Sequence, residues 1–330
     1  TSTVAERAIA MKRAQGVVLL GSATLPSNYG VELLYQWASA QLDLSAPGVA
    51  LSSMSMPNLV IAPNQLLSGQ TYVFQLSAGA ADAENGFAQL EVRTSTPPCC
   101  GNFAAYPVHA RSMQDTVTLA TTGWWDEAED LPLEYRFFFL NSDDLSTRVP
   151  LTVSSPLISA DVQLPPSDAI VTLEVEVSDL HGAATLDQFN VTVERPDSSS
   201  VVGGMEGLLL DVVQKQCGDA IAGGHYMLVM QLATAVGQLL NAENALSSNG
   251  RRRRLGVEES LRVDMLEHLL AASTHTVATT ETAQMQAHAL TKMSAMPAQL
   301  NPAARLLVFL LISEIAQLST ASGDRDAMSS

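Results

Sequence analysis

Apolar and polar residues alternate along several short segments of the first 195 residues. Two of them, residues 71–76 and 171–177, alternate almost without a break. Because successive side chains of a strand point to opposite faces of its sheet, this period of two is typical of half-buried β-strands. A turn at Asn85-Gly86 follows the first segment, and a turn between Asp179 and Gly182 follows the second. The chain alternates again after each turn, at residues 88–92 and 189–193. Each turn with its two flanking segments therefore predicts a hairpin.

These segments belong to an internal repeat of about 100 residues. Residues 17–20 have a counterpart at 117–119, and Trp37 has one in Phe137. A repeat of this length, built from short strands, predicts two immunoglobulin-like or fibronectin-type-III-like β-sandwiches. Large aromatic side chains fill the space between the two sheets of such a fold. The aromatic residues expected in the cores or anchoring a loop on them are Tyr35, Trp37, Trp124, Tyr135 and Phe137.

After Pro196 the apolar spacing becomes helical, with stripes such as Leu306, Leu307, Leu310 and Leu311. Asn301-Pro302 has an N-cap residue followed by proline at the first helical position. The pattern predicts about five helices, at residues 205–217, 225–246, 258–273, 280–294 and 302–319.

The fold class is therefore β followed by α: two tandem sandwiches and then an all-α domain, not a βαβ arrangement. Proline-bearing segments at Pro97-Pro98 and Pro196 are expected joints, because proline cannot donate to a strand ladder. The predicted domains are a first sandwich at 1–96, a second at 97–196, a linker at 197–204 and a helical domain at 205–330.

The charge and hydropathy of the chain argue against two classes of function, nucleic-acid binding and membrane spanning. The chain has a net charge of −17, which repels phosphate backbones and argues against nucleic-acid binding. Its longest apolar run, residues 306–312, is far shorter than the ~20 residues that span a bilayer. The chain begins with Thr1 and shows no signal peptide. It is therefore expected to be a piece of a longer protein, attached to a membrane only through parts outside this chain.

Catalytic motifs are missing. The sequence has no Gly-x-Ser-x-Gly, no glycine-rich phosphate loop and no His-Glu-x-x-His, and no two histidines stand four residues apart. We therefore predict neither an enzyme nor a cofactor. An unrecognised hydrolase would need either a serine with a histidine or a histidine with a carboxylate in one cleft, and only the fold can show such a convergence.

Residues 124–130 are chemically the densest stretch, with four acids after two tryptophans. Their carboxylates could supply oxygen ligands to Ca²⁺. The run lacks the ligand spacing and glycine of a helix–loop–helix calcium loop, so a solvated acidic loop is favoured. A calcium- or carbohydrate-binding module is the alternative function. The candidate calcium ligands are Asp126, Glu127, Glu129 and Asp130.

The three cysteines are candidates for disulfides. The adjacent residues Cys99 and Cys100 can close only a vicinal disulfide, so bonds to more distant partners are easier. A bond from either residue to Cys217 would join the second sandwich to the helical region and leave one free thiol.

Two further motifs are expected at the protein surface. Asn190-Val191-Thr192 is an N-glycosylation sequon. A tetrabasic run lies between glycines and is expected in a loop between two helices, where it would be solvated, cleaved by a processing protease, or bound to an acidic partner. Its residues are Arg251, Arg252, Arg253 and Arg254.

An ordered set of motifs in residues 15–195 resembles a known family, the receptor-for-egg-jelly (REJ) region of polycystin-1-like proteins. The motifs are Leu33-x-Tyr35-x-Trp37, Leu59-x-Ile61, Leu66-x-x-Gly69-x-x-Tyr72-x-Phe74, Gly86-x-Ala88-x-x-x-Val92, Pro97-Pro98-x-x-Gly101, Gly123-Trp124-x-Asp126 and Pro132-Leu133-x-Tyr135-x-Phe137. The resemblance implies tandem extracellular modules of a membrane protein, often ciliary. It also implies that residues 205–319 correspond to the helical subdomain of an autoproteolytic (GAIN-type) domain.

Two departures limit this resemblance. Relatives commonly have a cysteine before the Gly-Trp pair, whereas Thr121-Thr122 stand here, so the implied partner of Cys100 is missing. His268-Leu269 is followed by Leu270, so self-cleavage is not predicted. The resemblance implies a non-enzymatic adhesion segment on the extracellular side of a membrane, with the ciliary membrane as the implied location. The implied partners are a polycystin-2-like channel, a ciliary surface fibre or another copy.

Overall fold

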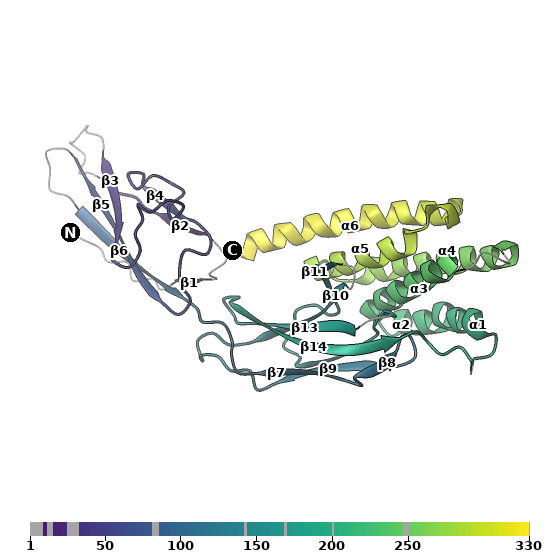
Figure 1. Cartoon of the computed structure of the whole chain (residues 1–330). Coiled ribbons are helices and arrows are strands. Elements are labelled where there is room, and N and C mark those ends of the chain that lie inside the picture. Colours follow the sequence, from purple (N-terminus) through teal and green to yellow (C-terminus); the bar gives the residue numbers. More distant parts are fainter. Residues whose placement is uncertain are drawn as a thin grey trace. The chain divides into compact units, whose positions relative to one another are not determined.

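The computed structural model describes residues 9–11, 16–24, 33–80, 86–141, 144–167, 170–199, 201–246 and 251–329 (Figure 1). The chain forms two compact units. The first unit consists of Thr1–Cys100, Trp124–Glu134 and Val177–Thr185, and the second of Gly101–Gly123, Tyr135–Glu176 and Leu186–Ser330. The second sandwich and the helices thus share a unit, while two loops of that sandwich belong to the first unit. The domain boundaries expected from the sequence stay a prediction.

The first sandwich has one four-stranded sheet, in the order β1-β6-β5-β3, and one two-stranded sheet, β2-β4. β1 runs parallel to β6, and the other pairs are antiparallel. Its strands are β1 (Ile9–Met11), β2 (Val17–Leu20), β3 (Leu34–Ser39), β4 (Asn58–Ile61), β5 (Thr71–Gly79) and β6 (Gly86–Thr94).

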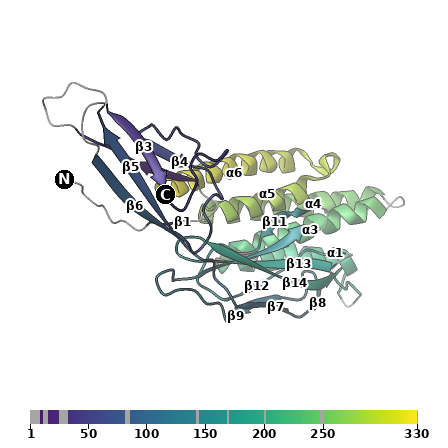
Figure 2. The same ribbon diagram turned by 60° about the vertical axis from the view of Figure 1, so that its left-hand side comes forward.

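The second sandwich has a five-stranded sheet, in the order β11-β10-β13-β14-β8, which covers a three-stranded sheet, β12-β9-β7 (Figure 2). Its strands are β7 (Asn102–Tyr106), β8 (His109–Arg111), β9 (Val117–Thr122), β10 (Glu134–Asn141), β11 (Asp144–Pro150), β12 (Ser159–Val162), β13 (Ile170–Ser178) and β14 (Ala184–Glu194). Both predicted sandwiches are confirmed.

Each strand of the first sandwich has a counterpart in the second, which adds β7 and β11. In the first, β1 pairs in parallel with β6, with Ile9 opposite Val92. In the second, β8 pairs in parallel with β14, with His109 opposite Thr192. The positions in β1 and β8 are 100 residues apart, the offset that the sequence repeat predicts. The repeat therefore specifies the same strand order twice.

The aromatic residues of the repeat lie in the two cores. Trp37 is buried, and its indole Nε1 donates to the carbonyl oxygens of Met56 and Pro57 at 3.1 and 3.3 Å. Phe137 is buried against Phe103, with 5.7 Å between the ring centroids. Tyr135 is buried, whereas Tyr35 and Trp124 are half-buried. Trp125, next to Trp124 in the sequence, is exposed.

The helical region matches the predicted spacing, with three differences. The first predicted helix is divided by a π-helical segment, the third predicted helix starts at Arg251 instead of residue 258, and the last continues past residue 319. The elements are α1 (Gly204–Asp211), η1 (Val212–Gln216), α2 (Cys217–Ala222), α3 (Tyr226–Leu246), α4 (Arg251–His275), α5 (Thr280–Ser294), η2 (Pro297–Gln299) and α6 (Pro302–Ser329). None of the helices in the described ranges is long and apolar enough to cross a bilayer.

The tetrabasic run corrects a prediction. Arg251, Arg252, Arg253 and Arg254 form the first turn of α4 and not a loop. Arginine is among the better helix formers, and the single Gly256 does not interrupt the helix. Residues 247–250, where the expected loop begins, lie outside the described residues.

Helices α3 to α6 run side by side (Figures 1 and 2). Their apolar faces form one core that also includes Met113 of the second sandwich. Polar groups add to this junction: the side chain of Gln231 on α3 accepts from the backbone N–H of Gln163 at 2.8 Å and donates to the Leu151 carbonyl at 3.0 Å. Sandwich and helices therefore share both apolar and polar contacts.

His288 on α5 makes the stability of this unit depend on pH. Its ring packs edge-on against Phe139, with centroids 5.7 Å apart, and its Nε2 has no hydrogen-bond partner among the described residues. Burial, helped by the charge of Lys292, lowers the pKa of His288 from 6.5 to about 4. Below pH 6.5 the unfolded chain therefore takes up a proton that the folded chain refuses, and stability falls as the pH falls.

We expect this one group to cost about 2–3 kcal/mol of unfolding free energy between pH 6.5 and pH 4. Urea denaturation of the wild type and of His288→Leu at both pH values measures it, because the difference between the two proteins removes the effect of the carboxylates. Equal pH dependence in both proteins would show that His288 titrates normally.

Candidate functional site

Three aspartates from two loops of the first unit lie close together. Asp126 and Asp130 belong to the loop between β9 and β10, and Asp179 directly follows β13. One carboxylate oxygen from each lies within 4.8 Å of the other two. All three residues are buried, at 6%, 8% and 4% exposure. We call Asp126, Asp130 and Asp179 the aspartate cluster.

Backbone hydrogen bonds hold the two loops in place. Trp125 and Cys99 exchange a pair of them, at 2.9 and 3.0 Å. The N–H of Leu180 donates to the carbonyl of Asp130 at 2.9 Å, which joins the loop 124–134 to the loop 177–185. The Asp179 carboxylate closes its own turn by accepting from the Ala183 N–H at 2.8 Å. The positions of the cluster residues are therefore fixed by the backbone.

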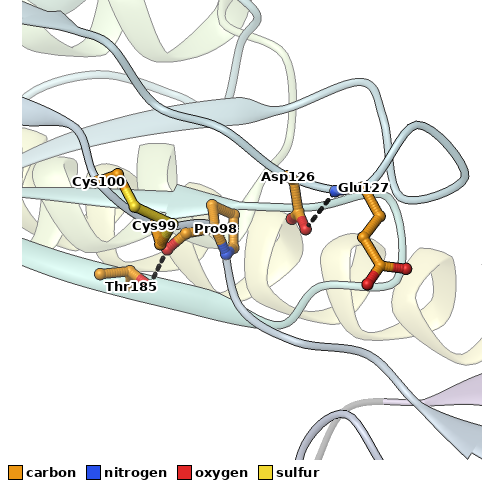
Figure 3. Close-up of a disulfide and its surroundings, with 6 residues drawn as sticks. All are labelled: Pro98, Cys99, Cys100, Asp126, Glu127 and Thr185. Carbon is orange, nitrogen blue, oxygen red and sulfur yellow. Dashed lines mark hydrogen bonds between the residues drawn. A yellow bond between two sulfur atoms is a disulfide. The ribbon is translucent and has the colours of Figure 1, made fainter.

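The two oxygens of Asp126 have different environments. Oδ1 accepts from the backbone N–H of Glu127 at 2.8 Å, as Figure 3 shows. Oδ2 is buried and has no hydrogen-bond partner among the described residues. Burial raises the pKa of Asp126, and the charges of Asp179, Asp130 and Glu127 raise it further, against the effect of the Glu127 N–H.

Ser95 and His181 complete the surroundings of the cluster. Ser95 directly follows β6 and is buried. Its hydroxyl oxygen lies within hydrogen-bond distance of Asp179 Oδ2 and, at 3.3 Å, of Asp130 Oδ2. A single hydroxyl proton cannot serve both carboxylates at once. His181 Nε2 is 3.5 Å from Asp130 Oδ1 and is an ion partner only when protonated.

The other two predicted calcium ligands are elsewhere. Glu127 and Glu129 both pair with Arg93 on β6, at 2.5 and 3.3 Å, on the partly exposed surface. Their charges are satisfied there by a guanidinium, so they do not join the cluster. The structure thus brings together Asp126 and Asp130 of the predicted set, removes Glu127 and Glu129, and adds Asp179.

The cysteines correct a second prediction. Cys99 and Cys100 form a vicinal disulfide next to the loop that carries Asp126 (Figure 3). Thr185 donates to the carbonyl of the preceding Pro98. Cys217 is a free thiol, fully buried in the helical core 3.9 Å from the sulfur of Met265, where burial raises its pKa to about 12. A thiol in that position is inaccessible to either of the other two.

Asn190 is exposed on β14, and its side-chain oxygen accepts from the Thr172 hydroxyl at 2.9 Å. Its amide nitrogen is the atom that a glycan would modify. Glycosylation at this position stays a prediction.

The sequence of this chain matches a known protein family. A family model described as REJ domain matches residues 3–229, which includes both sandwiches and the first helices. The proposed equivalence of residues 205–319 with a GAIN-type helical subdomain extends well beyond this match and stays a prediction. A search of curated proteins finds no match.

Solved structures of adhesion proteins align with the sandwiches at low similarity. The N-terminal eight immunoglobulin domains of Down Syndrome Cell Adhesion Molecule are 15% identical over 58% of this chain and 24% of that one, with a TM-score of 0.31. Chicken CNTN1 FN1–FN3 is 9% identical over 58% and 68%, with a TM-score of 0.29. Murine CEACAM1b is 12% identical over 56% and 95%, with a TM-score of 0.26. The chain thus spans about a quarter of the first of these structures.

Proposed function

Because this chain belongs to the REJ domain family, we propose that it is a non-enzymatic, extracellular adhesion segment of a polycystin-1-like membrane protein. In this proposal it works by presenting surfaces to other proteins. The proposed partners are a polycystin-2-like channel, a ciliary surface fibre or another copy of the chain, and the proposed location is the ciliary membrane.

The observation that carries the structural part of this proposal is the ion network of the second unit. Arg136 on β10 bridges Glu176 on β13 and Glu281 on α5, the latter at 2.7 Å. Burial acts to raise the pKa of Glu281, but the hydrogen bond and charge of Arg136, together with hydrogen bonds from the backbone of Glu281 and from Thr279, outweigh this and the pKa is lowered. Because the pKa of Arg136 is raised and that of Glu281 is lowered, this pair stays charged at neutral pH.

Arg148 extends the same network. It contacts Glu174 at 2.6 Å and Glu176 at 2.9 Å, and its guanidinium lies 3.9 Å from the centre of the Phe138 ring. Each of the two guanidinium groups contacts two carboxylates through different nitrogens, and a planar fork held at two points fixes orientation as well as distance. A sandwich held to a helical bundle in this way is suited to bearing load and keeping surfaces in a fixed orientation.

The extracellular placement predicts an N-linked glycan on Asn190 of the native protein. The side chain is exposed, so the glycan needs no rearrangement of the sheet. Enzymatic release of the glycan converts the asparagine to aspartate, which peptide mass spectrometry detects. Asn102 is also exposed on a strand but has no sequon, and it should remain unchanged. An unmodified Asn190 in protein that resists protease applied to intact cells would contradict the proposal.

The partner is tested separately, by capture from ciliary membranes with the full-length protein as bait. Recovery of a polycystin-2-like channel, a surface fibre component or a second copy supports the assembly role. Recovery of none of the three would overturn it.

A further inference from the structure

The aspartate cluster carries more negative charge than its protein neighbours neutralise. Among the described residues, its single ion pair is the one between Asp130 and His181. Arg93, the one arginine among the described residues of the first unit, is already engaged by Glu127 and Glu129. Burying carboxylates without opposite charge is unfavourable, so the cluster needs either protons or a cation.

The orphaned oxygen of Asp126 points to the cation. This side chain is more than nine-tenths buried, yet its Oδ2 has no hydrogen-bond donor among the described residues. Backbone N–H groups donate to Oδ1 of the same carboxylate and to Oδ1 of Asp179. An electron-rich oxygen left free beside two further carboxylates is the arrangement of a ligand without its ion.

The donor set selects the class of cation. All the groups are oxygens, from three carboxylates and the Ser95 hydroxyl, and hard cations prefer oxygen, whereas zinc sites usually include nitrogen or sulfur. Oxygens up to 4.8 Å apart can share one Ca²⁺, because two opposite bonds of about 2.4 Å span about that distance. Mg²⁺ needs a tighter octahedron, with bonds of about 2.0–2.1 Å.

We propose that Asp126, Asp130 and Asp179 bind one calcium ion, with the hydroxyl of Ser95 beside it. The ion ties three segments of the first unit together: the loop 124–134, the loop 177–185 and the end of β6. Calcium sites of extracellular modules have dissociation constants of about 10⁻⁴–10⁻³ M, and a site of three carboxylates belongs at the tighter end of that range.

Calorimetry and thermal unfolding of the chelator-treated full chain test the site. We expect one calcium ion bound per chain and a rise in melting temperature of about 5 °C at a hundredfold excess over the dissociation constant. Mg²⁺ at the same concentration should give a much smaller rise. The absence of calcium binding would overturn the proposal, and an equal effect of Mg²⁺ would overturn the choice of calcium.

The variant Asp126→Asn separates binding from folding. The amide keeps Oδ1 for the Glu127 N–H and removes one charge from the cluster, so the calcium-free variant should melt no lower than the calcium-free wild type. Its affinity for calcium should be at least tenfold lower than that of the wild type. Glu129→Gln removes a charge from the same loop outside the cluster and should keep the wild-type response. A folded Asp126→Asn that binds calcium as tightly as the wild type would overturn the assignment.

Terbium luminescence gives a second readout. Tb³⁺ replaces Ca²⁺ at oxygen sites and is sensitised by nearby tryptophan, and Trp124 and Trp125 directly precede Asp126. Excitation of tryptophan should give terbium emission that calcium displaces in the wild type and in Glu129→Gln. The emission should be lost in Asp179→Asn, and persistence there would count against the site.

Discussion

Replacing Arg262 with leucine is expected to lower the unfolding free energy of the second unit by about 3–5 kcal/mol. Arg262 lies on α4 with 0% exposure. Its guanidinium donates to the Met293 carbonyl at 2.7 Å, to Asn241 Oδ1 at 2.9 Å and to Gln299 Oε1 at 3.0 Å. These acceptors belong to α5, α3 and η2, so one side chain joins four elements.

The large effect has two causes. Leucine removes the donor of three hydrogen bonds inside the helical bundle, of which the one to the Met293 carbonyl is fully buried, and a buried group that loses its partner costs about 1–3 kcal/mol. It also removes the positive charge beside Glu258, which is buried and whose charge opposes the lowering of the Arg262 pKa by burial. The loss of favourable apolar contact is small, because leucine fills part of the same space.

Urea denaturation followed by circular dichroism measures this effect. Arg305→Leu is the matched control: Arg305 donates one hydrogen bond, from Nε to the Leu300 carbonyl at 2.9 Å, and is exposed, so its loss should cost about 1 kcal/mol or less. Arg262→Lys should recover little, because an ammonium group cannot match three acceptors spread around a planar fork. Wild-type stability of Arg262→Leu would show that the acceptors find other donors.

The burial of Arg262 could not be predicted from the sequence pattern. It stands between Leu261 and Met265 in an apolar stripe, where an arginine is normally expected to face solvent. The structure buries it because Met293 lies in the last turn of α5, where helix carbonyls lack intrahelical donors. That requirement comes from α5 and is not visible in the sequence of α4.

Only part of the aspartate cluster could be predicted from the sequence. Asp126 and Asp130 are found from local density of acids, and the sequence predicts both. Asp179 and Ser95 come from distant segments, and only the fold places them beside the loop. Glu127 and Glu129 are excluded by Arg93, which is more than thirty residues away in sequence. Pairing over such separations leaves no local signal.

The repeat, in contrast, could be predicted almost entirely from the sequence. Strand alternation is a local property, and a hundred-residue offset specifies which strands correspond. The structure keeps the same offset in two parallel pairs that the alternation did not predict, β1 with β6 and β8 with β14. The cysteines could not be resolved in this way, because pairing of Cys99 with Cys100 depends on the backbone at Cys100, which has a φ of 73°.

Trp37→Ala and Phe137→Ala are each expected to destabilise their own unit by about 3–5 kcal/mol. Trp37 is 4% exposed and Phe137 is 2% exposed, and each ring fills the space between two sheets. Alanine leaves a cavity that the surrounding strands cannot close. Trp37→Ala also leaves the Met56 and Pro57 carbonyls without their indole donor.

Hydrogen exchange distinguishes the two units. Trp37→Ala should speed the exchange of amides in β5, and Phe137→Ala that of amides in β9, each with little change in the other strand. Trp37→Phe keeps an aromatic ring and should lose much less stability than alanine, since it gives up mainly the indole hydrogen bonds and a smaller volume. Equal acceleration of β5 and β9 by either alanine variant would show that the two sandwiches unfold as one.

The comparison of the two variants tests the repeat itself. Trp37 and Phe137 occupy the same position in the two copies, so their environments should impose the same kind of cost despite the different side chains. Trp37 has polar partners and Phe137 has an aromatic partner, Phe103. A similar loss in both units would mean that filling the space between the sheets dominates. A markedly larger loss for Trp37→Ala would mean that the hydrogen bonds of the indole contribute comparably to the first core.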